Sequence, residues 1–321
     1  MPSYSGVWNL VQQLQGVAAG TWPGYEPLTG NIALFAGGQM PATTNVIDYI
    51  QISTTAQTAQ SFGQLTSPGT YNMGGFASST RGVFGAGITF NTSSITYVTI
   101  STRSNSTLFG DLTQARWSLA ALSNSTRGMW LGGVTGSYFN VIDYVTIAST
   151  GAATNFGQLI NQQQTQSGCA SPTRGIVAGG YLSSGSDINT IQYVTIATTG
   201  NAVNFGQLTD YSQAGASCSS NTRGLTAIGY SSVSTITSAI NYVTIATTGN
   251  AITFGTLAVA RSSLTGTSNS TLGIFAGGSS GSASNVIEYV TIASTGNGTS
   301  FASLSSARYN LTSCSNSHGG L

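Results

Sequence analysis

One pattern of hydrophobic and polar residues occurs six times along the chain. The pattern is a strand containing Tyr-Val-Thr-Ile, then Phe-Gly-Gln-Leu, and then Ser-Thr-Arg-Gly at the start of a hydrophobic strand that ends in glycines, each with close variants among the copies. The last copy lacks the Ser-Thr-Arg-Gly segment. The tyrosines recur every 47 to 49 residues, at Tyr49, Tyr97, Tyr144, Tyr193, Tyr242 and Tyr289. A period of this length with four short strands per unit is typical of a β-propeller. The sequence therefore predicts an all-β, six-bladed propeller over residues 31–321.

A single repeat, residues 117–160, shows how the four strands follow one another. We expect strand a at 117–122, strand b at 127–133, strand c at 141–148 and strand d around 155–159. Strands b and c are apolar at successive positions, which indicates strands covered on both faces, as a blade is by its two neighbours. Strand b ends in Gly-Gly or a close variant, which allows positive φ and close packing of blades.

This repeat resembles the kelch repeat. The shared features are an arginine before strand a, a hydrophobic run ending in Gly-Gly, a tyrosine in strand c, and an aromatic residue followed by leucine in strand d. Phenylalanine stands where kelch repeats usually have tryptophan, at Phe62, Phe109, Phe156, Phe205, Phe254 and Phe301. The resemblance covers residues 31–321 and implies a kelch-like propeller, but it implies no particular function.

The two ends of the repeat array predict how the ring closes. The chain enters the pattern at strand b, in residues 31–38, and leaves it after a strand a in residues 309–315. We therefore expect blade 1 to take strand a from the C-terminal end and strands b, c and d from the N-terminal end. A ring closed in this way has no long exposed strand edge.

Charges at two repeat positions support this closure. An arginine precedes strand a in three blades, at Arg116, Arg261 and Arg308, and an acid precedes the strand-c tyrosine in three blades, at Asp48, Asp143 and Glu288. With the expected closure, both sets fall in blades 1, 3 and 6. We interpret them as ion pairs within each blade, across two strand spacings or roughly 10 Å. The alternative interpretation is a ligand site.

A second set of arginines opens strand b in four consecutive blades, at Arg81, Arg127, Arg174 and Arg223. These residues have no repeating acidic partner, and their position on an inner strand predicts a partial ring near the axis on one face. Each guanidinium either caps the carbonyls of its own turn or contacts a partner or an anion.

The composition excludes several classes of function. Charged residues make up 5% of the chain, against a usual ~25%, and the net charge of +1 gives no basic face for nucleic acid. No apolar run is long enough to cross a membrane, and the N-terminus lacks the basic segment of a signal peptide. We therefore expect neither nucleic-acid binding nor membrane insertion.

No constellation of residues indicates an enzyme. The only histidine, His318, lies in a segment expected to be frayed, so the sequence predicts no catalytic, cofactor-binding or metal-binding residues and no cofactor. The ligands of kelch-type copper oxidases and the arginine cluster of sialidase propellers have no counterparts. The cysteines Cys169, Cys218 and Cys314 share one repeat position with Phe, Leu and Thr, which indicates buried free thiols at a packing position.

Residues 1–30 lie outside the repeat and form an N-terminal arm. Apolar residues at helical spacing, Ser5 as N-cap and Gly20 as a stop predict a short helix. Such an arm either packs on its own propeller or docks on a partner. Its candidate contact residues are Trp8, Leu10, Val11, Leu14 and Trp22.

The opposite face of the ring carries the b–c loops, whose length varies from repeat to repeat. Aromatic residues occur there among Ser and Gly, at Phe90, Tyr138, Phe139, Tyr181 and Tyr230. Exposed aromatic residues in such loops suit the recognition of sugars or protein surfaces, and structural packing is the alternative.

The start of the chain resembles virion structural proteins of tailed phages, especially cyanobacterial ones. The matching features are Met-Pro-Ser-Tyr-Ser-Gly-Val-Trp, a Gln-rich stretch, Ala-Gly-Thr-Trp-Pro and repeats of the Asp-Tyr-Val-Thr-Ile-Ala-Ser-Thr-Gly type. The resemblance implies a non-enzymatic virion component, assembled in the host cytoplasm, whose arm binds other virion proteins. The alternatives are a propeller that binds a host-surface glycan or receptor, and a cellular kelch-type adaptor.

Overall fold

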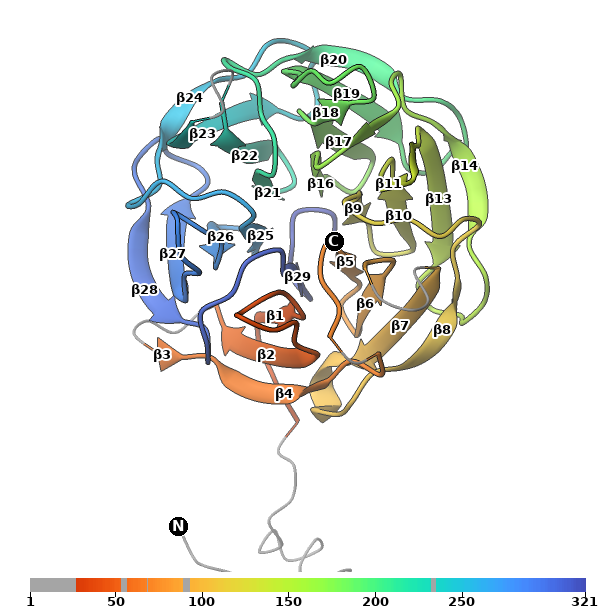
Figure 1. The fold of residues 1–321 in the computed structure, drawn as a ribbon, viewed down its shortest axis with the longest axis vertical. Coiled ribbons are helices and arrows are strands. Elements are labelled where there is room, and N and C mark those ends of the chain that lie inside the picture. The colour runs from red at the N-terminus through yellow and green to blue at the C-terminus, as the bar shows by residue number, and fades with distance from the viewer. Residues whose placement is uncertain (1–26, 53–56, 68, 89–92, 232–234) are drawn as a thin grey trace, which may run out of the picture.

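The computed structural model describes residues 27–52, 57–67, 69–88, 93–231 and 235–321. Six sheets are arranged around a central axis, five of four strands and one of five, and in each the four main strands run antiparallel and follow one another from the axis to the rim (Figure 1). The predicted six-bladed all-β propeller is therefore confirmed. The helix predicted within the N-terminal arm (residues 1–30) falls in residues 1–26, outside the described residues.

The strands are named a to d from the axis outward, in blades 1 to 6. The a strands are β29 (Thr312–Ser315), β5 (Gly74–Ala77), β9 (Ala120–Ser123), β16 (Ser167–Ala170), β21 (Ala216–Ser219) and β25 (Thr265–Ser268). The b strands are β1 (Ile32–Ala36), β6 (Arg81–Gly85), β10 (Arg127–Leu131), β17 (Arg174–Ala178), β22 (Arg223–Tyr230) and β26 (Leu272–Ala276). The c strands are β2 (Val46–Gln51), β7 (Ser94–Thr99), β13 (Val141–Thr146), β19 (Thr190–Thr195), β23 (Ile236–Thr244) and β27 (Val286–Thr291). The d strands are β4 (Gln60–Gln64), β8 (Thr107–Asp111), β14 (Thr154–Gln158), β20 (Val203–Gln207), β24 (Ile252–Thr256) and β28 (Thr299–Ser303).

Short elements lie between these strands. They are β3 (Gln57–Thr58), β11 (Val134–Thr135), β12 (Ser137–Tyr138), β15 (Gln163–Gln164), β18 (Tyr181–Leu182) and the 3₁₀ helix η1 (Ile100–Thr102). We call the side of the ring that carries the b–c loops and the crossovers between blades the b–c face, and the opposite side the a–b face. No helix among the described residues is long and apolar enough to cross a membrane.

The ring closes as the sequence predicts. Strand β29 pairs antiparallel with β1, with Leu34 opposite Cys314, so blade 1 combines strands from both ends of the repeat array. A reciprocal contact extends this pairing, because Ile32 N donates to Asn316 Oδ1 at 2.8 Å and Asn316 N donates to Ile32 O.

The hydrophobic core is divided among the junctions between blades. Each of the six buried clusters contains residues of two neighbouring blades, as Leu34 of β1 and Phe84 of β6 illustrate at the first junction. Both faces of every blade are therefore buried, which explains why strands b and c are apolar at successive positions.

The glycine of Phe-Gly-Gln-Leu is required by the next blade. A Cβ on Gly157 would overlap the carbonyl oxygen of Gly200, in the turn between strands c and d of blade 4. The equivalent glycines of blades 1, 2, 4 and 5 meet the following blade in the same way. Blade 6 has Ala302 at this position, and there β3 pairs with β28 in parallel instead.

The cysteine column fills a second gap between blades. The glycine that follows the first residue of strand b leaves space for a strand-a side chain of the preceding blade, as Gly273 does for Cys218 and Gly224 for Cys169. All three cysteines are free and buried, as predicted. Burial raises the pKa of the Cys169 thiol to about 12, so this thiol is protonated and unreactive.

Strand a is shorter than the sequence predicts. In blade 3 it begins at Ala120 rather than at residue 117, because Ser118 has a left-handed backbone with φ of 54° that interrupts the extended chain. The same interruption occurs in all six blades, and it forms the site described next.

Candidate functional site

The three predicted ion pairs are present, and each lies within one blade. Arg116 is 3.0 Å from Asp143, Arg308 is 2.9 Å from Asp48, and Arg261 pairs with Glu288. All six side chains are buried. Burial lowers the pKa of each arginine and the carboxylate opposes this shift, so each arginine stays charged beside its partner. These pairs stabilise the blades rather than form a ligand site.

The acid position has a further role that the sequence did not reveal. The side-chain oxygen accepts a hydrogen bond from the crossover that arrives from the preceding blade: Thr113 N donates to Asp143, and Ala258 N to Glu288. Neutral residues do the same, since Gln192 accepts from Ile160 N and Asn241 from Thr209 N. In blade 4, Gln163 stands at the arginine position and accepts a 2.8 Å hydrogen bond from Gln192, so an amide pair replaces the ion pair.

The second set of arginines joins neighbouring blades. Nη1 of Arg127 donates to the carbonyls of Ile196 and Ala197, at the end of strand c in the next blade, at 2.9 and 2.8 Å. Its guanidinium lies 4.9 Å from the ring centre of Tyr144 in its own blade. Arg81, Arg174 and Arg223 make equivalent contacts.

Two expectations for these arginines are wrong. The carbonyls they bind belong to the next blade rather than to their own turn, and the guanidinium lies over the third strand from the axis rather than near the axis. In blade 1, whose strand b begins with Ile32, Arg103 from blade 2 lies over Tyr49 at 5.1 Å. A contact with a partner or an anion stays a prediction.

The a–b end of the central channel is closed by residues 316–321. Nε2 of His318 lies 2.9 Å from Ala77 O and 3.1 Å from Ser123 Oγ, while Nδ1 accepts from Gly320 N at 3.1 Å. Gly319 N donates to Ser219 O across the channel, and a Cβ on Gly320 would overlap Ser123 O. The expectation of a frayed segment is therefore wrong. Burial lowers the pKa of His318, and the hydrogen bonds place its single proton on Nε2.

The b–c end of the channel is framed by six residues with left-handed backbones. One residue from each blade takes part, and every φ lies between 51° and 57°. The members of this axial ring are Asn310, Asn72, Ser118, Thr165, Ala214 and Ser263. Each backbone N–H donates to the carbonyl of the ring residue in the preceding blade, at 2.7 to 3.1 Å, so the hydrogen bonds form a closed circle around the axis.

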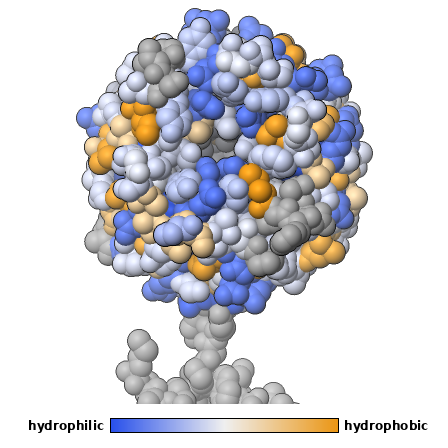
Figure 2. Space-filling view, viewed as in Figure 1, coloured by the Kyte–Doolittle hydropathy of each residue, from blue (hydrophilic) through white to orange (hydrophobic). Residues whose placement is uncertain are grey.

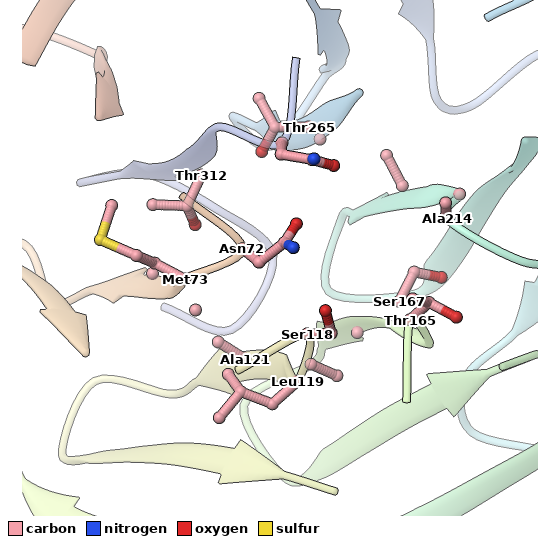
Figure 3. Close-up of a pocket in the computed structure, with 18 of the residues that line it drawn as sticks. Asn72, Met73, Ser118, Leu119, Ala121, Thr165, Ser167, Ala214, Thr265 and Thr312 are labelled. Carbon is pink, nitrogen blue, oxygen red and sulfur yellow. The ribbon is translucent and has the colours of Figure 1, made fainter. Parts of the chain in front are cut away.

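Below the axial ring lies a cavity of about 140 Å³ that is open on the b–c face (Figure 3). Its wall consists of the ring residues and the first half of each strand a, with Ser167, Ser217, Thr265, Thr312 and Ser313 among the lining side chains. No charged side chain lines it in the described part of the chain. Figure 2 views this face and shows its centre hollowed.

Some side chains of the axial ring are not bonded to the protein. Thr165 Oγ1 donates to Gln164 O, and Asn310 Nδ2 donates to Gln39. Among the described residues, no hydrogen bond engages the amide of Asn72 or the hydroxyls of Ser118 and Ser263. In Figure 3 the Asn72 amide and the Ser118 hydroxyl point toward the open centre.

Aromatic residues border the axial ring. In three consecutive blades a half-buried aromatic residue immediately precedes the ring residue: Tyr309, Tyr71 and Trp117. Their fixed offset from strand a is a sequence signal for this border, but no aromatic residue marks the position in the other three blades.

The predicted aromatic residues of the b–c loops continue this border. The rings of Tyr138 and Tyr181 are 6.4 Å apart, and the Tyr138 hydroxyl accepts from Gln164, the residue before Thr165. Tyr230 pairs through its backbone with Gln213, the residue before Ala214. Phe139 is half-buried beside Tyr138, and Phe90 lies outside the described residues.

The candidate residues of the arm, Trp8, Leu10, Val11, Leu14 and Trp22, also lie outside the described residues. The base of the arm is held on the a–b face. Leu28 N donates to Ser101 O, and Gly30 O accepts from Asn316 Nδ2. Among the described residues, no group of three or more His, Cys, Asp or Glu side chains could hold a metal ion.

Among known proteins, no protein-family model and no curated protein matches this chain.

Proposed function

We propose that the protein is a binding module whose ligand side is the b–c face and whose N-terminal arm attaches it to a larger particle. The propeller fold is consistent with such a module. The residues that recur at fixed repeat positions in several blades serve the scaffold: the acids hold crossovers, the arginines join blades, and the glycines leave gaps that the cysteines and turns of neighbouring blades fill.

One observation carries this proposal: the axial ring presents unbonded polar side chains inside a border of half-buried aromatic residues. Binding sites are usually concave, with aromatic walls and a few polar groups that fix orientation. On the a–b face, residues 316–321 close the end of the channel, and the base of the arm lies beside them.

The double substitution Tyr138→Ala with Tyr181→Ala tests the ligand side. We expect the full-length variant to lose cosedimentation with intact cyanobacterial cells that retain the parent protein. The matched control is Leu108→Ala, which removes an apolar side chain that is 66% exposed on the outer strand β8. Equal retention of all three proteins would refute the b–c face as the ligand side.

We further propose that the particle is the virion of a tailed phage, in which this kelch-like propeller is a structural and display component. The resemblance of the first residues and of the repeat to phage structural proteins supports this assignment. The placement of the arm base on the a–b face would leave the b–c face directed outward.

Deletion of residues 1–26 tests the attachment. We expect the truncated propeller to fold, because the described core begins after this segment, and to be missing from purified particles by mass spectrometry. Normal incorporation would argue against the arm as the anchor. Absence of the parent protein from purified particles would favour the cellular adaptor instead.

A further inference from the structure

We infer that the axial ring and the cavity below it bind one neutral sugar ring at the end of a glycan. This inference rests on the proposed function, because it names the ligand class of the b–c face. Four properties of the site support it. The axial ring has side chains at positions that favour glycine, some of its polar groups have no hydrogen-bond partner among the described residues, none of these residues lines the cavity with a charged side chain, and the volume of the cavity suits a single sugar ring.

The axial ring keeps side chains where glycine would be less strained. A left-handed backbone costs an L-residue free energy that glycine does not lose. The chain uses glycine freely for this purpose elsewhere, as at Gly132 and Gly133, yet none of the six ring positions is glycine. Strain that persists at a concave site points to a role for the side chains.

The free groups of the ring match the hydroxyls of a sugar. The Asn72 amide both donates and accepts hydrogen bonds, and so do the hydroxyls of Ser118 and Ser263. They come from blades 2, 3 and 6, so they surround the axis rather than lie in one row. A ligand rich in hydroxyls can bond to all three at once.

The electrostatics of the cavity exclude a charged ligand. No charged side chain lines it among the described residues, and the nearby Arg116 is occupied by Asp143. An anionic or cationic group would lose hydration here without gaining an opposite charge. The favoured ligand is therefore neutral.

The size of the cavity and its apolar wall favour a ligand with a single sugar ring inside the cavity. The cavity of about 140 Å³ is close to the ~150 Å³ that accepts a benzene ring in an engineered protein cavity. Its open side leaves room for exocyclic groups and for the next sugar. The apolar side chains of Met73, Leu119 and Leu264 also line the wall and add apolar surface for the C–H face of a sugar.

Glycine substitutions separate binding from stability. Asn72→Gly, Ser118→Gly and Ser263→Gly each remove a free polar group and relieve the left-handed backbone. The matched control, Ala214→Gly, relieves the same backbone but removes no polar group. The probes are methyl glycosides of neutral hexoses and N-acetylhexosamines, measured against the full-length protein by saturation-transfer NMR and titration.

We expect at least one neutral glycoside to bind the parent protein and Ala214→Gly equally. Asn72→Gly should weaken it about tenfold, the loss of roughly one hydrogen bond, with little change in the melting temperature. Three results would overturn the inference: no transfer to any neutral glycoside, equal binding by all four variants, or transfer only to an anionic glycoside or to a serine- and asparagine-bearing peptide. If cell binding still depends on Tyr138 and Tyr181 in any of these cases, the proposed function stands and only the sugar assignment fails.

Discussion

The two ends of the central channel are built from the same six strands, yet they differ in what their polar groups contact. At the a–b end, residues 316–321 cross the axis, and His318 bonds to Ala77, Ser123 and Gly320. At the b–c end, the backbone of the axial ring is fully bonded in a circle, but the side chains of Asn72, Ser118 and Ser263 are not bonded within the described structure.

This difference distinguishes the scaffold from the candidate site. A polar group that is bonded inside the protein contributes to stability and has little left to offer a ligand. A polar side chain on a strained backbone, with no protein partner, contributes nothing comparable to stability. Substitutions at the a–b end should therefore reduce mainly the stability of the fold. Substitutions at the b–c end should reduce mainly ligand binding.

The largest effect on stability is expected at the Arg116–Asp143 pair, which holds the segment that leads into Ser118. Asp143→Leu leaves a buried arginine without its partner and should lower the free energy of unfolding by about 3–5 kcal/mol. The double variant Arg116→Gln with Asp143→Gln copies the Gln163–Gln192 pair of blade 4 and should cost much less. Urea denaturation of both variants measures the difference; equal losses would show that the charge is not the cause.

An intermediate effect is expected at the a–b end. His318→Ala removes buried hydrogen bonds and should cost about 1–3 kcal/mol. Because burial lowers the folded-state pKa of His318, the unfolded chain binds a proton more readily as the pH falls. The stability from this group is full above the ordinary pKa of about 6.5 and is lost as the pH decreases toward the lowered value.

Thermal melts between neutral and mildly acidic pH check this dependence. The parent protein should lose stability with acidification more steeply than His318→Gln, which has no titrating ring. Identical pH profiles would mean that His318 is not held neutral at the axis.

The smallest effect on stability is expected in the axial ring itself. Asn72→Gly relieves a left-handed backbone but increases the freedom of the unfolded chain, so the net change should stay within about 1 kcal/mol of zero. Gly320→Ala at the opposite end should destabilise, because its Cβ overlaps Ser123 O. A large loss of stability in Asn72→Gly would show that the axial ring stabilises the fold and would contradict its assignment to ligand binding.

The sequence predicted the features that repeat with the same residue type. The six blades, the closure by β29, the three ion pairs and the buried cysteine column all follow from identical or complementary residues at a fixed period. The reach of Arg127 to Ile196 could not be predicted, because it depends on how closely adjacent blades pack.

The candidate site could not be predicted from the sequence for the most part. The axial ring contains Asn, Ser, Thr and Ala, so no shared residue marks the column, and no glycine signals its left-handed backbone. The closure by His318 depends on the path of residues 316–321 across the axis, which no local pattern encodes. The aromatic residues of the b–c loops were identified, but Trp117 and Tyr309 were interpreted only as the start of strand a, and Tyr71 was not identified.

We propose that the b–c end of the channel is the ligand site and that the rest of the propeller is its scaffold. Chemical-shift mapping during titration with a neutral methyl glycoside tests this proposal. We expect shifts in the Asn72 side-chain amide and in the backbone amides of Ser118 and Ser263, with those of Gly319 and Gly320 unchanged. Shifts confined to the a–b end or to the outer strands would contradict it.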